Sequence, residues 1–225
     1  MSKRSPLELA YFKSVHYYSK MLKQVFIFPL PKISLQPGAR KPLNVFEPRY
    51  LKMVKDAVSR KIPIALAYGI RDSDETVDEN YLSISHESLP SVRRVVCMGV
   101  PEIIQECNDG SMIIMLQGEG RGRLLQEVES VEPYIICEYE EFCGSNELRD
   151  ENILLLRRLK TQLEKWVKKK VKLECQKNIL NPCITQPCKI IGLYAELMID
   201  SPEVKQEVLE MSDINDKIQY IVFNC

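Results

Sequence analysis

The sequence predicts an α+β protein in which a β-rich domain precedes a helical bundle. Short runs of strand-forming residues, separated by Pro, Gly and Asn turn signals, fill residues 24–145. From residue 146 onward, apolar residues instead recur every three or four positions, as on one face of a helix. Hydrophobic residues make up 45% of the 225 residues and charged residues 28%, which excludes wholesale disorder. We therefore divide the chain into an N-terminal helical extension (1–23), a β domain (24–145) and a helical bundle (146–225).

The N-terminal extension has one apolar stripe at helical spacing. Its members are Leu7, Tyr11, Val15, Tyr18 and Leu22. We interpret it as a helix packed on the protein body. Two alternatives stay open: a helix that binds a partner or a second copy of the chain, and an organellar targeting segment. A homo-oligomer would form through this helix or through the bundle.

The β domain is predicted to contain a series of short strands and one helix. The strands cover residues 25–28, 42–46, 64–70, 95–98, 103–107, 112–116, 124–125 and 134–139. Asp109-Gly110 predicts a tight hairpin, because these residues tolerate the positive φ angles of such turns. Pro48 predicts the start of a helix, since proline loses no amide bond at the first helical position.

The bundle is predicted to begin with a helix from about Asn146 to Lys172. Further helices are expected around 190–197, after the Ser201-Pro202 cap and after Ser212-Asp213. The first helix carries more leucines than one buried stripe needs, at 154, 155, 156, 159 and 163. We therefore expect it to pack on two sides, on the bundle and on the β domain near Tyr139 or Phe142. This packing would leave a cleft between the domains as a peptide site.

Charge and cysteine usage narrow the functional classes. Lys plus Arg and Asp plus Glu both total 31, so the chain lacks the basic field of most nucleic-acid binders. No apolar run approaches the roughly 20 residues of a membrane span, and the N-terminus does not resemble a secretory signal. The eight cysteines include no Cys-x-x-Cys pair. We expect reduced thiols, no metal site, no cofactor and a cytoplasmic location.

Catalytic motifs are not found. The glycines from Gly118 to Gly122 fail the dinucleotide fingerprint because Arg123 stands at the third glycine position, so a strand bend is the better interpretation. The acidic stretch 71–80 lacks the spacing of a calcium loop. A cysteine hydrolase is a remaining alternative, and it would need a thiol within hydrogen-bond reach of His86 or His16.

The most specific pattern lies in residues 26–56. It combines a Phe28-Pro29-Leu30 strand, a Pro37-Gly38 turn and Phe46-Glu47-Pro48-Arg49-Tyr50 leading into a helix. It closely resembles the opening of the Lon N-terminal, substrate-binding domain. The resemblance covers about residues 24–224. Matches in the family's order are Asp109-Gly110, Leu116-Gln117-Gly118, Arg121, Arg123, Glu132-Pro133-Tyr134 and Gln206 to Leu209. The family usually has a bulky aromatic residue at Gly122, so we expect the bend after Gly118 to be looser here.

This resemblance implies a PUA-like β pseudo-barrel followed by a helical bundle. It also implies a non-catalytic module that recognises extended or unfolded polypeptides, as an adaptor in protein quality control, and that partners an ATP-dependent protease. The family's ATPase and Ser-Lys protease modules are not expected in this chain. Peptide would dock on an apolar groove or strand edge, and the candidate contacts are Phe28, Leu30, Pro31, Phe46 and Tyr50. We interpret Glu47, Pro48 and Arg49 as structural, with Phe46 and Tyr50 forming an apolar staple at the helix start.

An RNA-binding protein is the alternative function, because PUA-like barrels also bind RNA. The basic residues are dispersed apart from Arg93-Arg94, Arg121 to Arg123 and Lys168-Lys169-Lys170. Convergence of these groups on one surface would favour RNA binding.

Overall fold

A computed structural model describes residues 23–71, 78–86, 88–172 and 184–225. The predicted N-terminal helix, Cys175 and Cys183 lie outside these residues. The strands are β1 (Lys23–Pro31), β2 (Arg40–Val45), β3 (Ile64–Ile70), β4 (Tyr81–Ser83), β5 (Ser91–Arg93), β6 (Val95–Gly99), β7 (Glu102–Glu106), β8 (Met112–Gln117), β9 (Gly120–Glu127) and β10 (Ile135–Glu141). The helices are α2 (Pro48–Arg60), α3 (Asp150–Lys170), α5 (Pro187–Met198), α6 (Pro202–Glu210) and α7 (Ile214–Asn224).

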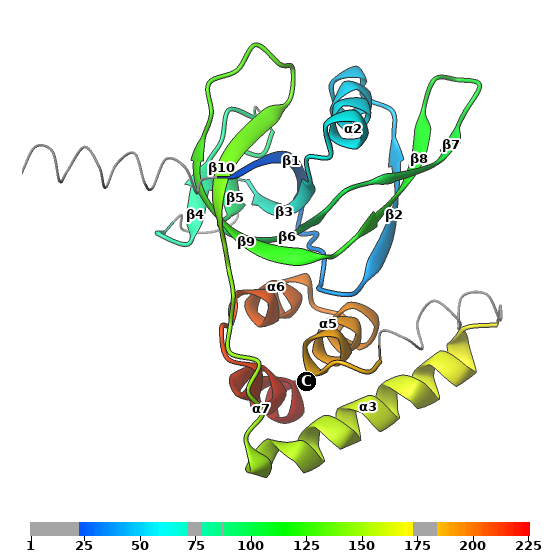
Figure 1. Cartoon of the computed structure of the whole chain (residues 1–225), viewed down its shortest axis with the longest axis vertical. Helices are drawn as coiled ribbons and strands as arrows, with labels where there is room; N and C mark the ends of the chain where they lie inside the picture. Colours follow the sequence, from blue (N-terminus) through cyan, green and yellow to red (C-terminus); the bar gives the residue numbers. More distant parts are fainter. Residues whose placement is uncertain (1–22, 72–77, 87, 173–183) are drawn as a thin grey trace, which may run out of the picture.

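The larger sheet closes into a barrel through its first strand (Figure 1). The sheet order is β1-β10-β9-β6-β3-β5-β4, and β1 also pairs with β3. Phe26 of β1 lies opposite Ile136 in the antiparallel pair and opposite Ile64 in the parallel pair. Strands β2, β8 and β7 form a second sheet, with α2 between it and the β9–β10 loop. This arrangement confirms the predicted α+β class, with a β pseudo-barrel followed by helices.

Strands β1 and β3 are buried on both faces. Phe26 and Phe28 belong to one apolar cluster, whereas Val25 and Ile27 belong to a second one. Strand β3 alternates in the same way and has no exposed residue. Burial on both faces explains why the sequences of these strands are continuous apolar runs rather than alternating ones.

Gly122 lies in β9, four residues after Gly118. A Cβ atom there would lie 2.3 Å from Met98 Cε and 2.7 Å from Tyr139 Cδ2. The Met98 and Tyr139 side chains therefore occupy the space that a side chain at residue 122 would need.

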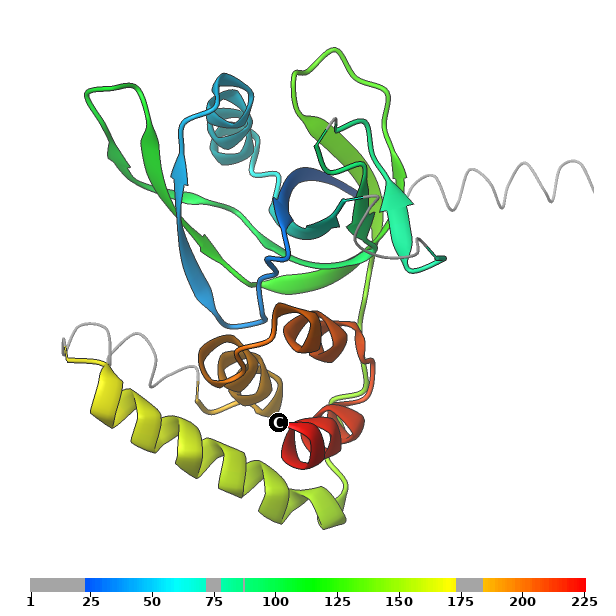
Figure 2. The ribbon, with the colours of Figure 1, turned by 180° about the vertical axis from the view of Figure 1, so that it is seen from behind.

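Helix α3 packs on α5 and α7, on the side of the bundle that faces away from the barrel (Figure 2). Leu156, Leu159 and Leu163 form its buried face, whereas Leu154 is 71% exposed. The prediction that this helix packs on both domains was therefore wrong. The additional leucines face solvent or lie at the edge of the bundle, which leucine periodicity alone does not distinguish.

Helices α5 and α6 make the junction with the barrel instead. The buried Gln206 amide of α6 donates a 2.9 Å hydrogen bond to the Val95 carbonyl of β6. Gly192 of α5 approaches the backbone of Pro37 so closely that a Cβ atom would lie 2.1 Å from the Pro37 carbonyl oxygen. No helix among the residues described is long and apolar enough to cross a membrane.

Candidate functional site

The Phe46–Tyr50 motif starts α2 by local interactions. Pro48 occupies the first turn, and the Glu47 carbonyl accepts a 2.9 Å bond from the Leu51 N–H. The Glu47 carboxylate pairs with the Arg49 guanidinium at 2.8 Å. A carboxylate at this end also suits the positive pole of the helix. These contacts join Glu47 and Arg49 to each other at the first turn of α2, and their role as structural residues stays a prediction.

The two aromatic residues of the motif have different environments. Tyr50 is buried against Phe28, with ring centroids 4.4 Å apart, whereas Phe46 is 68% exposed. The predicted Phe46–Tyr50 staple was therefore wrong. The pairing of Tyr50 with a strand residue 22 positions earlier could not be inferred from helix-start rules.

The second family motif, Glu132-Pro133-Tyr134, lies against the same helix. The Tyr134 phenol donates a 2.7 Å hydrogen bond to Asp56 of α2, and its ring lies 4.8 Å from that of Phe26. The Lys52 ammonium bonds to both Asp56 and Glu132. The β9–β10 loop is thus fastened to α2 at several points.

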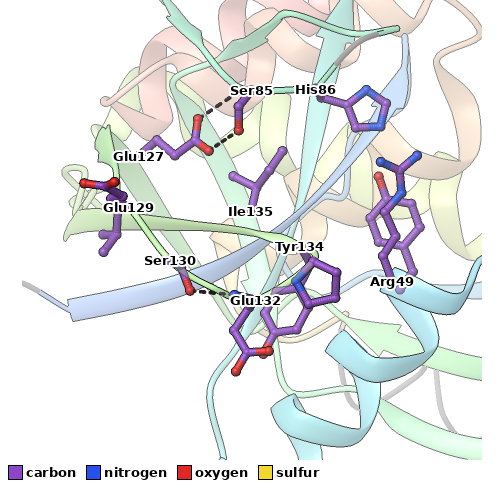
Figure 3. Close-up of a pocket in the computed structure, with 12 residues that line it drawn as sticks. Arg49, Ser85, His86, Glu127, Glu129, Ser130, Glu132, Tyr134 and Ile135 are labelled. Atoms are coloured by element: carbon purple, nitrogen blue, oxygen red, sulfur yellow. Dashed lines mark hydrogen bonds between the residues drawn. The ribbon is translucent and has the colours of Figure 1, made fainter.

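An open groove of about 490 Å³ lies between the start of α2, the β9–β10 loop and the segment after β4 (Figure 3). Its lining residues are Arg49, Tyr50, Ser85, His86, Glu127, Val128, Glu129, Ser130, Glu132, Pro133, Tyr134 and Ile135. Tyr50, Tyr134 and Ile135 are buried and form an aromatic and aliphatic base. The groove therefore joins the two stretches on which the family resemblance depends.

The rim of the groove carries charges of both signs. Arg49 and His86 lie along one part, and Glu127, Glu129 and Glu132 along another (Figure 3). The Glu127 carboxylate accepts a 2.9 Å bond from the Ser85 N–H and a second bond from the Ser85 hydroxyl. These bonds fix the segment after β4 to the end of β9.

The chemistry of the groove suits binding better than acid–base catalysis. Burial raises the pKa of Tyr50 to about 12, and burial together with the bond to Asp56 raises the pKa of Tyr134. Both phenols therefore keep their protons at neutral pH. His86 Nδ1 accepts a 3.2 Å bond from the Leu89 N–H, and no cysteine lines the groove. His16 lies outside the described residues, within which no cluster of metal-ligating side chains occurs.

The sequence-predicted contact residues do not converge on one surface. Tyr50 lines the groove, with Arg49 beside it, whereas Phe28 lies behind Tyr50 in the core. Leu30 is half-buried and Pro31 is exposed at the end of β1, and neither lines the groove. The loop residues 127–135 were missed as site residues, although Glu132-Pro133-Tyr134 was a detectable signal within them.

Most of the arginines singled out in the sequence are held by the fold. Arg94 donates to the carbonyls of Glu79, Leu124 and Leu125. Arg121 donates to two carbonyls at the end of α6, and Arg93 pairs with Glu210 at 3.4 Å. Lys168, Lys169 and Lys170 form the last turn of α3, the helix that packs on α5 and α7.

The closed barrel and its following helices define a class of α+β domains, and comparison with known proteins identifies the family. The family model described as the ATP-dependent protease La (LON) substrate-binding domain matches residues 24–223. The chain therefore belongs to this family.

Relatives and solved structures agree with this assignment. Lon protease 1 of Hydrogenovibrio crunogenus is 23% identical over 203 residues, which cover 88% of this chain and 23% of that protein. Lon protease of Buchnera aphidicola is 26% identical over 201 residues, covering 87% and 24%. The chain thus spans about a quarter of the length of these curated relatives.

The fold matches two solved N-terminal domains. A Lon N-terminal domain protein from Xanthomonas campestris superposes with a TM-score of 0.60 at 20% identity, covering 89% of this chain and 97% of that one. The N-terminal domain of Mycobacterium avium complex Lon protease gives 0.59 at 15% identity, covering 89% and 96%.

Proposed function

We propose that this protein is a non-catalytic module that recognises extended or partly unfolded polypeptides in the groove between α2 and the β9–β10 loop. The observation that carries this proposal is the convergence of the two family motifs on one open groove with an apolar base. Membership of a family described as substrate-binding supports it. We expect an ATP-dependent protease among the partners of this module, which would act as an adaptor in cytoplasmic protein quality control.

The groove has the features that a polypeptide ligand requires. Its base offers aromatic and aliphatic surface to apolar side chains, and its rim offers acceptors and donors to a peptide backbone. Val131, at the tip of the β9–β10 loop, is 100% exposed next to the residues that line the groove. An apolar side chain left fully in water at a loop tip is available for contact with a partner.

RNA binding is the less favoured function. Arg94 and Arg121 direct guanidinium N–H groups at backbone carbonyls, and the lysines at 168–170 belong to α3, which packs on α5 and α7. An RNA backbone needs a continuous positive surface, so these positions do not support that proposal.

The test is a binding titration with a fluorescently labelled, permanently unfolded polypeptide such as a reduced and carboxymethylated secretory protein. We expect saturable binding to the parent chain and a loss of roughly tenfold in affinity for Val131→Asp. Ile104→Asp is the matched control, because Ile104 is an exposed apolar residue, 52% accessible, on β7 of the other sheet. Absence of binding, or equal losses in both variants, would refute the groove as the site. Salt-dependent binding of an RNA oligonucleotide in its place would favour the alternative.

A further inference from the structure

A second cavity, of about 280 Å³, lies at the junction of barrel and bundle. It is lined by Gln36, Pro37, Glu119, Gly120, Arg121, Phe142, Cys143, Gly144, Ser145, Asn146, Cys188, Ile191, Gly192, Val208, Ser212, Ile214 and Lys217. Gly120, Cys143 and Asn146 are exposed, so the cavity opens to solvent on their side. It shares no lining residue with the groove at α2.

Lys217 of α7 brings a largely buried side chain to this cavity, with its ammonium group facing the cavity space. The residue is 8% exposed, and the described residues provide its side chain with no hydrogen-bond or ion-pair partner. Two other lysines near the junction differ in this respect: Lys41 pairs with Glu196 at 2.8 Å, and Lys205 donates to the Glu196 carbonyl. An ammonium without a partner is costly to bury, so the site is matched to an anion that arrives from outside.

Arg121 adds a second positive group to the same cavity. One terminal nitrogen of its guanidinium donates to the carbonyls of Leu209 and Met211, at 2.7 Å each. Its other N–H groups have no acceptor among the described residues and remain available.

No carboxylate among the described residues pairs with the positive charge of the Lys217 ammonium group. Burial, followed by the positive charge of Arg121, lowers its pKa to about 7, while the thiols of Cys188 and Cys97 act weakly in the opposite direction. Glu119 is the single carboxylate among the lining residues, and it is exposed and forms no ion pair with Lys217. A bound carboxylate would supply the missing negative charge and return the pKa of Lys217 toward its usual range.

The walls of the cavity are apolar around these cations. Phe142, Ile191, Val208 and Ile214 contribute ring and aliphatic surface. A volume near 280 Å³ accommodates one or two amino-acid residues rather than a folded domain. Two positive groups surrounded by apolar walls suit a carboxylate that has an apolar residue next to it in the ligand.

We propose that this junction cavity binds a carboxylate of the recognised polypeptide, at its C-terminus or on an Asp or Glu side chain, through Lys217 and Arg121. The inference rests on the proposed function, because it assigns a second contact to the same class of ligand. An incoming carboxylate would accept hydrogen bonds from the Lys217 ammonium and from the free N–H groups of Arg121, while adjacent apolar side chains lie against Ile191 and Val208.

The first experiment compares labelled peptides of one apolar sequence by fluorescence anisotropy with the parent chain. One peptide ends in a free carboxylate, a second is amidated, and a third is amidated but carries an internal Asp. We expect the first or the third to bind roughly tenfold more tightly than the second, as one compensated charge allows. The first and third peptides identify the source of the carboxylate. Equal affinity of all three overturns the proposal without any mutation being needed.

The second experiment uses Lys217→Met, which keeps length but removes the charge. It should abolish the preference for a carboxylate, whereas Lys189→Met should retain it. Lys189 is a half-buried junction lysine that contacts Gly38 and does not line the cavity. The proposal is overturned if Lys217→Met still prefers the carboxylate peptide. It is also overturned if the cavity binds inorganic phosphate but the substitution has no effect on peptide binding. If unfolded polypeptide still binds and Val131→Asp still weakens it, this inference fails while the proposed function stands. If no polypeptide binds, both fail.

Discussion

The Tyr134 phenol and the Asp56 carboxylate are joined by a 2.7 Å hydrogen bond across 78 positions of sequence. The bond fastens the β9–β10 loop to α2 and so sets the width of the groove between them. Lys52 reinforces the contact, because its ammonium bonds to Asp56 and to Glu132 of the same loop. The groove is therefore a preformed feature of the barrel surface.

Tyr134→Phe removes this hydrogen bond and keeps the ring packed against Phe26. We expect a loss of about 1 to 2 kcal/mol in the free energy of unfolding, since the acceptor is charged. Urea denaturation measures this loss, and faster proteolysis within residues 128–133 would report a loosened loop. Tyr220→Phe is the control, because its phenol bonds to Glu207 at an exposed site in the bundle. Equal effects at both positions would show that the Tyr134 bond does not fix the loop.

The same cluster predicts acid sensitivity. Hydrogen bonds from Lys52 and then Tyr134 lower the pKa of Asp56. A carboxylate whose pKa is lower in the folded state binds fewer protons there, so its stabilising effect is present above its unfolded pKa and is lost as pH falls through the folded value. Asp56→Asn should therefore be less stable than the parent at pH 6 and should lose less stability between pH 5 and pH 2. Parallel stability curves for the two proteins would contradict this prediction.

Local signals predicted the parts of the fold that depend on neighbouring residues. Pro48 starts α2, Gly110 has the positive φ of a tight turn, and the Ser201 and Asp213 side chains cap α6 and α7. Each feature rests on backbone constraints within a few positions, which a single sequence reveals.

Long-range pairings were not predictable in the same way. The parallel pairing of β1 with β3 closes the barrel, but no local pattern encodes it. The short strands β4 and β5 were missed, because strands of three residues have no measurable periodicity. The junction cavity unites Arg121 and Lys217 from separate domains, so only the folded chain shows that two positive groups face one space.

The hydrogen bonds of Gln206 predict how much this residue stabilises the contact between the barrel and the bundle. Its amide donates to the Val95 carbonyl and to the Glu210 carboxylate, and the residue is 1% exposed. Gln206→Leu leaves the buried carbonyl without a donor and should cost about 2 kcal/mol. Thermal unfolding measures the loss, with Gln126→Leu on exposed β9 surface as the control. If Gln206→Leu is as stable as the parent, the bond contributes nothing to the junction.

The leucines of α3 should respond according to their burial rather than their spacing. Leu159→Asp buries an uncompensated charge against α5 and α7 and should cost about 3 kcal/mol or more. Leu154→Asp should stay within about 0.5 kcal/mol of the parent, because Leu154 is 71% exposed. Urea denaturation of both variants provides the comparison. A large loss for Leu154→Asp would mean that this residue is covered in solution, as in an oligomer formed through the bundle.

The lowered pKa of Lys217 predicts that the stability of the folded chain depends on pH in the alkaline range. Its pKa falls from 10.5 to about 7 in the folded chain, with burial as the largest cause and Arg121 as the next. Between pH 7 and about 10.5 the unfolded chain therefore carries more protons at this residue, so stability from this group rises with pH across that window. The full difference in the free energy of unfolding is on the order of 4 to 5 kcal/mol, because a tenfold change in a proton-binding constant corresponds to about 1.36 kcal/mol.

Lys217→Met removes the free-energy cost of burying a protonated lysine at neutral pH. The variant should be more stable than the parent at pH 6 to 7, and its advantage should shrink as pH rises toward 9.5, because the parent lysine becomes neutral when folded. Other groups that titrate in this range are common to both proteins, so the difference between their unfolding curves isolates Lys217. Lys189→Met should follow the parent at every pH. A constant difference between Lys217→Met and the parent would show that the Lys217 ammonium is solvated or paired in solution, and the junction cavity would then have no unbalanced charge to offer a ligand.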